Sequence, residues 1–363
     1  MSNLVQLRRR SAPPTASPVG GPLVDPQMRR VRYLRVSLTD RCNYRCTYCM
    51  PAEGVPHASR EDVLSFEEIA ETVRAFARWG VERVRLTGGE PTVRRGLPEL
   101  VGMLSDIAVA EDPARRVAVV MTTNGSRLTA LAEPLRAAGL AGMTVSVDSL
   151  RADRFAEITR SGELSQVLAG VEAASVAGFR GIKINTVAIR GFNDDELGEL
   201  ARWAWDRGHV PRFIEVMPMS GGRLYVPGEL LPAAEIRALV AEAAGAELVA
   251  DAGEGVAGLG PARYWRVAGG PYAGQRVGVI AAMTENFCAG CNRLRVSAGG
   301  QLHNCLARDD TGDLRSVLRA SGGQGPNLLE ARVRQILGHK QDGHGFTRDG
   351  RGGPDKAMIG IGG

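Results

Sequence analysis

The sequence predicts an α/β fold built on a parallel sheet, followed by a smaller α+β region toward the C-terminus. Three observations lead to this prediction. Six strand-like segments alternate with helical segments between residues 31 and 219, a pattern typical of a parallel sheet. Polar residues follow the carboxyl ends of successive strands, as they do in a TIM-type barrel. Past about residue 230 the alternation gives way to short strands and a Gly-rich stretch.

Each element is predicted from its own pattern of apolar residues. The six strands are expected at 31–40, 83–91, 117–125, 143–150, 181–189 and 212–219. Helical spacing predicts helices between them, among them 66–80, 127–138, 164–177 and 194–207. Because no GxGxxG fingerprint follows the first strand, a barrel is favoured over a doubly wound dinucleotide-binding sheet. Downstream we expect a helix near 230–244, strands at YWRV, RVGVI and RLRVS, and helices near 311–320 and 328–337.

Composition excludes several classes of protein. The chain has 363 residues, 44% of them hydrophobic, and a net charge of +5. Residues 1–28 carry arginines without an apolar segment behind them, so we interpret them as a disordered tail rather than a secretory signal. No run of about 18 apolar residues occurs, so no transmembrane helix is expected. Only 5% of residues are aromatic and no basic stripe is present, which argues against a nucleic-acid-binding module.

The cysteines fall into two groups of three. Six cysteines are too few for a disulfide scaffold in a chain of this length, so metal binding or catalysis is favoured. The first group, spaced C-x3-C-x2-C, could bind three irons of a [4Fe–4S] cluster and leave the fourth open to S-adenosylmethionine (SAM). The second, spaced C-x2-C-x13-C, suggests another such cluster whose open iron meets a substrate. The alternatives are zinc sites completed by His57 or by His303, and buried free thiols. The two groups are Cys42, Cys46 and Cys49, and Cys288, Cys291 and Cys305.

Several motifs resemble known families. DRCNYRCTYCM (40–50) resembles the signature of the radical-SAM superfamily, and LTGGEP (86–91) resembles its second motif. CNRLR (291–295), the C-terminal IGG, GFNDDE and RFIEVMPM are similar to the GTP 3′,8-cyclase family of molybdenum cofactor biosynthesis. This resemblance runs from about residue 29 to the end. It implies a partial TIM-type (βα)6 barrel, the radical-SAM core, at 29–245. It also implies a C-terminal α+β region with the second Fe–S cluster at 246–345, and a Gly-rich tail at 346–363 that enters the active site.

The resemblance also implies an activity. Enzymes of this family are lyases that convert GTP, with SAM and an electron, into 3′,8-cyclo-7,8-dihydro-GTP, the first step of molybdenum cofactor biosynthesis. The implied cofactors are two [4Fe–4S] clusters and SAM, and the implied location is the cytoplasm. The expected partners are flavodoxin or ferredoxin as electron donor and cyclic pyranopterin monophosphate synthase as the next enzyme. A homodimer stays open as the oligomeric state. Neither a nucleic acid nor a membrane is expected as a partner. A peptide-modifying radical-SAM enzyme and a zinc-bearing nucleic-acid module are the alternatives.

Residue roles follow from the same resemblance. The first cysteine group holds the SAM cluster and the second holds the substrate cluster. Residues implied to line the SAM site are Tyr48, Gly89, Ser146 and Met217. Those implied to contact GTP are Arg35, Arg85, Thr122, Lys183, Arg293, Leu294 and Arg295. Those implied to be catalytic are Arg35, Arg293, Arg295, Gly362 and Gly363. Arginine suits a triphosphate because its planar fork matches phosphate bidentately.

This chain departs from the family pattern at two places. His303 stands where relatives usually show a basic residue before the third cysteine of the second group. The tail DKAMIGIGG lacks the arginine that many relatives carry just before the final glycines. Neither departure affects a predicted ligand of a cluster.

Overall fold

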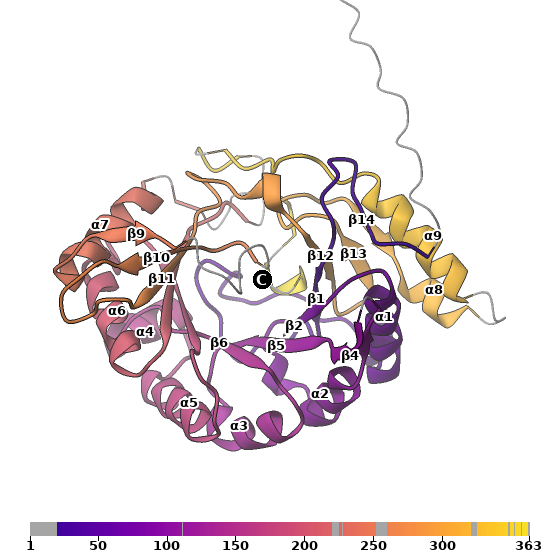
Figure 1. The fold of residues 1–363 in the computed structure, drawn as a ribbon, viewed down its shortest axis with the longest axis horizontal. Helices are drawn as coiled ribbons and strands as arrows, with labels where there is room; N and C mark the ends of the chain where they lie inside the picture. The colour runs from indigo at the N-terminus through magenta and orange to yellow at the C-terminus, as the bar shows by residue number, and fades with distance from the viewer. Residues whose placement is uncertain are drawn as a thin grey trace, which may run out of the picture.

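The structure is a computed structural model that describes residues 20–110, 112–219, 225–226, 228–251, 260–320, 325–347, 349–351, 353–356 and 358–361. Strands form a curved wall and helices lie outside it (Figure 1). In these residues the strands make one 12-stranded sheet and a separate hairpin, β3 (Ala108–Val109) with β4 (Asp112–Arg116). None of the helices described is long and apolar enough to cross a membrane.

The centre of the sheet is the predicted series of parallel strands. In order they are β1 (Tyr33–Ser37), β2 (Arg83–Thr87), β5 (Ala118–Thr123), β6 (Gly142–Ser146), β7 (Lys183–Ala188) and β8 (Val210–Glu215). The outer helices are α1 (Phe66–Arg78), α2 (Leu97–Ser105), α3 (Leu128–Ala137), α4 (Ala152–Thr159), α5 (Leu164–Val176), α6 (Leu197–Asp206) and α7 (Ala233–Ala244). The predicted partial (βα)6 barrel is therefore confirmed.

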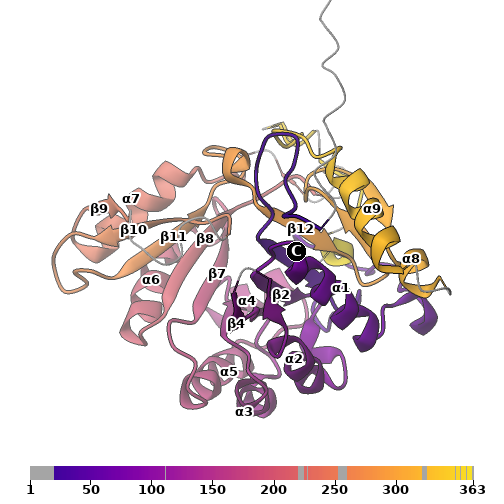
Figure 2. The ribbon, with the colours of Figure 1, turned by 45° about the vertical axis from the view of Figure 1, so that its right-hand side comes forward.

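Strands from the C-terminal part extend both edges of this core. β12 (Arg293–Val296) lies parallel to β1, and β11 (Arg276–Ile280) lies parallel to β8. Antiparallel strands continue outward, β13 (Gln301–His303) and β14 (Thr311–Asp313) beyond β12, and β10 (Arg263–Val267) and β9 (Leu248–Ala250) beyond β11. Figure 2 shows the two groups on opposite sides of the molecule. Because β11 and β12 sit at opposite edges, the segment 281–292 that joins them spans the open side of the barrel.

Alternation along the strands separates the core from the barrel interior. In β1, Leu34 and Val36 belong to the apolar core beneath the helices, whereas Tyr33 and Arg35 face the interior. Helix α1 begins at an ordinary capping signal. At α1, Ser65 and Glu68 form a capping box, with the Ser65 hydroxyl accepting from the Glu68 amide at 3.2 Å. Local sequence and tertiary packing thus favour the same fold.

Two expectations from the sequence need correction. Residues 311–320 were expected to be helical, but 311–313 form β14 and α8 (Arg315–Arg319) begins only afterward. The cause is antiparallel pairing of 311–313 with β13, and Gly312 lets this strand pack against α9 (Gly325–Leu337), where a Cβ would lie 2.1 Å from Ile336 Cδ1.

The second correction concerns the N-terminal tail predicted for 1–28. Residues 1–19 lie outside the described residues, but 20–28 pack against the domain. Leu23 is fully buried, and its amide donates to Trp79 O at 3.1 Å. Burial of this apolar side chain explains why the segment does not behave as a tail.

Candidate active site

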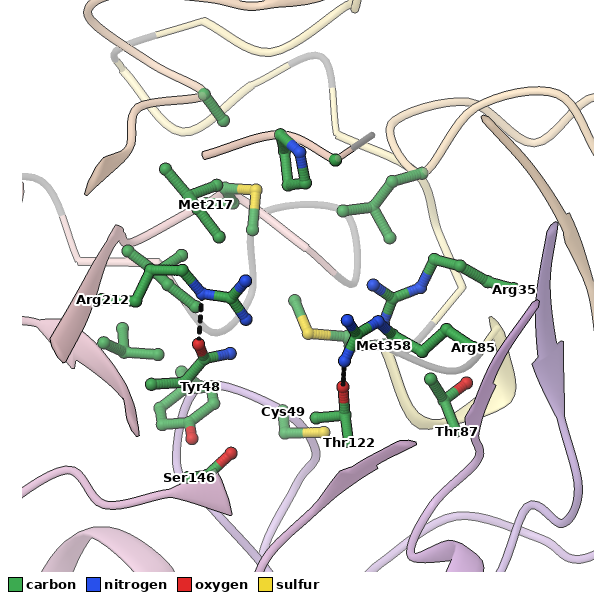
Figure 3. A pocket seen from close by; sticks show the side chains of 18 of the residues that line it. Arg35, Tyr48, Cys49, Arg85, Thr87, Thr122, Ser146, Arg212, Met217 and Met358 are labelled. Carbon is green, nitrogen blue, oxygen red and sulfur yellow. Dashed lines mark hydrogen bonds between the residues drawn. The ribbon is translucent and has the colours of Figure 1, made fainter. Parts of the chain in front are cut away.

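A single large cavity occupies the barrel interior, and all six core strands contribute to its lining. Both cysteine groups open onto it, although they come from opposite ends of the sequence. Figure 3 shows side chains from separate strands pointing into this space. Sixteen residues predicted for the site line it: Arg35, Cys42, Cys46, Tyr48, Cys49, Arg85, Gly89, Thr122, Ser146, Lys183, Met217, Cys288, Cys291, Arg293, Arg295 and Cys305.

Three predicted site residues are not among those lining the cavity. Leu294 is fully buried in the apolar core, because its neighbours Arg293 and Arg295 take the interior face of β12 and alternation turns Leu294 the other way. Its side chain is therefore not a GTP contact. Gly362 and Gly363 lie outside the described residues. The tail just before them does reach the site, since Met358 lines the cavity (Figure 3).

The first cysteine group follows β1 in a loop that is suited to a metal cluster. Backbone amides donate to its sulfurs, from Tyr44 to Cys42 at 3.3 Å and from Ile359 in the C-terminal tail to Cys49. Burial raises the pKa of the Cys42 thiol to about 11 and that of Cys49 to about 12. A thiolate in this loop thus needs a positively charged partner, which iron supplies, and amide-to-sulfur hydrogen bonds are a usual feature of cluster sites.

The glycine pair of LTGGEP allows β2 to end directly against this loop. A Cβ on Gly89 would lie 2.3 Å from Arg41 O and 3.0 Å from Cys42 N. The backbone contacts are close, with Gly89 N donating to Thr39 O at 2.7 Å and Glu90 N to Arg41 O at 2.8 Å. Glycine is therefore needed at 89 because the cysteine loop occupies the space of a side chain.

Two buried carboxylates, not predicted as site residues, organise the region around the first cysteine group. Tyr48 donates to Asp148 Oδ2 at 2.8 Å, and Val187 N donates to Asp148 Oδ1 at 2.8 Å. Burial raises the pKa of Asp148 to about 6. Glu90 accepts from Thr123 Oγ1 and from Asn124 N, each at 2.7 Å, which joins the ends of β2 and β5. These carboxylates fix the loops that surround the implied SAM residues.

The second cysteine group lies among cations. Cys291 N donates to Cys288 O at 3.0 Å, which closes the turn between the first two thiols. Arg293 Nη2 lies 3.8 Å from Cys291 Sγ, and Lys340, which is 3% exposed, donates to Arg293 O at 2.6 Å. Although burial alone would raise it, Arg293 and Lys340 lower the pKa of Cys291 to about 6. This environment favours the thiolate that a cluster requires.

The zinc alternative at this group receives no support from the geometry. His303 Nδ1 lies 3.1 Å from Lys356 Nζ, and the ring does not line the cavity. Among the residues described, no three Cys, His, Asp or Glu side chains converge closely enough to ligate one metal ion. A cube of four irons binds each thiolate at a different corner, so its ligands need not converge on one point.

A row of cations crosses the barrel wall between the cysteine groups. Arg295, Arg35 and Arg85 are register neighbours on β12, β1 and β2. Arg85 donates from Nη1 to Thr122 Oγ1 and Thr144 Oγ1, both at 2.9 Å, which fixes its guanidinium (Figure 3). Burial, followed by the neighbouring Arg295, depresses the pKa of Arg35 well below its usual value. An anion bound here would relieve this repulsion.

The opposite wall carries two more cations. Arg212 on β8, which the sequence analysis missed as a site residue, is 7% exposed and donates to Asn185 Oδ1 at 2.7 Å (Figure 3). Lys183 on β7 has a pKa lowered to about 7 by burial and by Arg212 and Arg85. The sequence could have revealed Arg212. In RFIEV it stands two residues before Ile214, so both side chains lie on the same face of the strand, close to its polar carboxyl end. The charge of the interior is therefore suited to a polyanion.

Comparison with known proteins decides the family. Residues 36–204 match the Radical SAM superfamily, and residues 210–346 match the family described as Molybdenum Cofactor Synthesis C. A GTP 3′,8-cyclase of Pelotomaculum thermopropionicum is 41% identical over 336 residues, covering 93% of this chain and 99% of that protein. The chain belongs to the GTP 3′,8-cyclase family. A second GTP 3′,8-cyclase, from Paracoccus denitrificans, is 42% identical and covers 90% of each chain.

Among solved structures, Streptococcus suis SuiB bound to precursor peptide SuiA is 16% identical, with a TM-score of 0.48 over 58% of this chain and 44% of that chain. As a member of the GTP 3′,8-cyclase family, the protein uses SAM and two [4Fe–4S] clusters, and its two cysteine groups fit them. All six cysteines are free of disulfides.

Proposed function

We infer that the protein converts GTP into 3′,8-cyclo-7,8-dihydro-GTP with SAM, two electrons and a proton, the first step of molybdenum cofactor biosynthesis. The observation that carries this inference is one cavity that both cysteine groups and a row of buried cations line together. Its curated relatives named GTP 3′,8-cyclase match over nearly the whole chain and support the same activity.

The first cysteine group and its surroundings form the proposed SAM site. Cys42, Cys46 and Cys49 would hold the cluster, which would supply the electron for reductive cleavage of SAM. The chain contributes position and exclusion of water. Tyr48, held by its hydrogen bond to Asp148, borders the site together with Ser146 and Met217 (Figure 3). Gly89 keeps β2 against the cysteine loop, so these walls are fixed relative to the cluster.

The cations form the proposed GTP site. Arg35, Arg85 and Arg295 form one wall, with Lys183 and Arg212 opposite, and all five line the cavity. A triphosphate carries several negative charges, and buried guanidinium groups bind phosphate with short, charge-assisted hydrogen bonds. Thr122, which accepts from Arg85, is proposed to share this contact. We propose that the guanine base of GTP lies near the second cysteine group, with Arg293 between the guanine and the cysteines. The reaction depends on geometry, because removal of the C3′ hydrogen from the ribose and closure of the new ring both need the reacting atoms at close range.

The proposed partners and compartment follow from the family. A low-potential flavodoxin or ferredoxin is the proposed electron donor, and cyclic pyranopterin monophosphate synthase the proposed next enzyme, while a homodimer stays open. We propose the cytoplasm as the compartment, because six free cysteines and two clusters suit a reducing environment. The final glycines, Gly362 and Gly363, are proposed to enter the cavity beyond Met358.

An isotope experiment tests the activity. Reduced, anaerobic protein is incubated with SAM and GTP deuterated at C3′, and the products are identified by mass spectrometry. We expect one deuterium in 5′-deoxyadenosine and a product isomeric with GTP that contains the new ring. ATP serves as a control that should give no cyclic product. Unlabelled 5′-deoxyadenosine together with unchanged GTP would show that the substrate is another molecule.

A further inference from the structure

The loop that carries Cys288 and Cys291 has little regular structure of its own. Within 281–292 the described secondary structure is one short turn, Cys288–Gly290. The ends of the loop are well fixed. Glu215, fully buried, accepts from Met283 N at 2.7 Å and Thr284 N at 3.0 Å, and Tyr33 N donates to Asn292 O at 3.2 Å. The turn between these anchors needs support from elsewhere in the chain.

Arg29 provides that support at the cysteine itself. Its Nη1 donates to Cys288 O at 2.7 Å. The same carbonyl accepts from Cys291 N at 3.0 Å, the bond that sets the spacing of the two thiols. Arg29 therefore binds the atom on which the geometry of the C-x2-C turn depends, from a segment more than 250 residues earlier in the chain.

The same guanidinium also holds a second segment that touches Cys288. Its Nη2 donates to Gln341 O at 2.6 Å, and its Nη1 reaches Asp342 O at 3.3 Å. Two residues further on, the backbone amide of His344 donates to the sulfur of Cys288. Arg29 thus fixes the carbonyl of Cys288 on one side. On the other side it fixes the segment 341–344, which donates a hydrogen bond to the sulfur of Cys288.

Asp25 orients Arg29. Its Oδ2 accepts from Arg29 Nε at 2.6 Å, while Oδ1 accepts from the amides of Gln27 at 3.0 Å and Arg29 at 2.9 Å. The side chain of Asp25 is 0% exposed and that of Arg29 is 8% exposed. This ion pair is therefore not a solvated surface pair of little energetic value, and the rigid fork of Arg29 serves several partners at once.

We propose that Arg29, oriented by Asp25, is a positioning residue for the Cys288 ligand of the second cluster. The proposal rests on the proposed function only for the role of that cluster in binding the substrate. Outer-shell hydrogen bonds around a metal ligand commonly change affinity or activity by about 10- to 100-fold when they are removed. The N-terminal segment 20–31 is, in this view, a working part of the active site.

The first test isolates the second cluster. In a full-length chain with Cys42, Cys46 and Cys49 changed to Ser, only the second cluster remains. Arg29→Met in this background should lower the bound iron and change the electron paramagnetic resonance spectrum of the reduced cluster. Arg32→Met is the matched control, because Arg32 pairs with Glu82 and its side chain is 42% exposed. This control should leave both readouts unchanged.

The second test measures coupling in the otherwise intact enzyme. Arg29→Met should make about 10-fold less cyclic product for each 5′-deoxyadenosine, because SAM cleavage at the first cluster continues while the substrate is held poorly. Asp25→Asn should give a smaller change in the same direction. Arg29→Lys, which keeps the charge but loses the fork, should resemble Arg29→Met.

The outcomes separate positioning from general stabilisation. A native second-cluster spectrum and native coupling in Arg29→Met would overturn the proposal, as would full rescue by Arg29→Lys. Equal loss of iron at both clusters with a lowered melting temperature would also overturn it, because that result indicates a structural role alone. If the wild-type protein makes no cyclic product from GTP, the proposed function fails, while the spectral comparison, made without GTP or SAM, still decides the role of Arg29.

Discussion

GTP binding should be accompanied by proton uptake at Lys183. Burial, followed by the positive charges of Arg212, Arg85, Arg83 and Arg276, lowers the pKa of this amine to about 7. Because the pKa lies below its usual value, Lys183 in the free protein is mostly neutral above pH 7. A bound triphosphate replaces repulsion with attraction and returns the pKa toward its usual value of about 10.4.

The size of the effect follows from these two values. At pH 8 a group with a pKa of about 7 is roughly one-tenth protonated, so full charging on binding takes up about 0.9 proton. Affinity for GTP should accordingly fall as pH rises from 7 toward 10, by up to about 1.4 kcal/mol per pH unit. A phosphate loses its last proton at about pH 6, so GTP itself contributes little at pH 8.

Calorimetry in two buffers measures this directly. Anaerobic titrations with GTP, without SAM, in HEPES and in Tris at pH 8 give the protons exchanged from the difference in heat. Tyr33 titrates in the same range, because Arg85 and Arg35 outweigh burial and lower its pKa to about 8. The number of protons that Lys183 takes up is therefore the difference in proton uptake between wild type and Lys183→Met. A difference near zero would refute the reasoning, and Lys183→Arg, always charged, should bind GTP without this uptake.

Four further predictions concern other parts of the site. Replacing Cys42 with Ser should abolish SAM cleavage, whereas replacing Cys288 should weaken GTP binding and leave some cleavage; stoichiometric zinc in place of about eight irons per chain would contradict both clusters. Gly89→Ala should displace the cysteine loop and lower iron toward about four per chain, and a native iron content would show that the backbone yields easily. Arg295→Ala should weaken GTP binding by about 1.5–3 kcal/mol in calorimetry with SAM binding unchanged, so normal GTP affinity would exclude it from the site. Deleting Gly362 and Gly363 should keep SAM cleavage but reduce cyclic product by ~100-fold, and an unchanged rate would assign the tail no role.

The sequence predicted the strands well because they depend on local patterns. Apolar alternation predicted the strand that contains β1, and the spacing of the cysteines indicated clusters before any fold was known. Motif resemblance carried residue roles one position at a time, and at Leu294 the side chain does not face the cavity. There the alternation of β12 turns the side chain into the apolar core.

The rest could not be predicted because it depends on contacts between distant segments. Lys340 becomes part of the second cysteine site only through its hydrogen bond to Arg293 O. The RFIEV pattern indicates which strand face carries Arg212, but only the closure of the wall brings this residue opposite Arg85. Asp25 and Arg29 stand in a segment whose composition resembles a tail, and their role emerges from a carbonyl more than 250 residues away.

The sharing of one sheet by both parts of the chain sets an order for synthesis on the ribosome. Strand β1 cannot pair on its outer side until β12 has been synthesised, and β8 cannot until β11 has been. Both edges of the parallel core therefore expose unpaired backbone until the last third of the chain emerges. Such exposed margins invite association with other chains, and pairing across long separations is slow. A chain that stops before residue 276 should therefore aggregate rather than yield a working half.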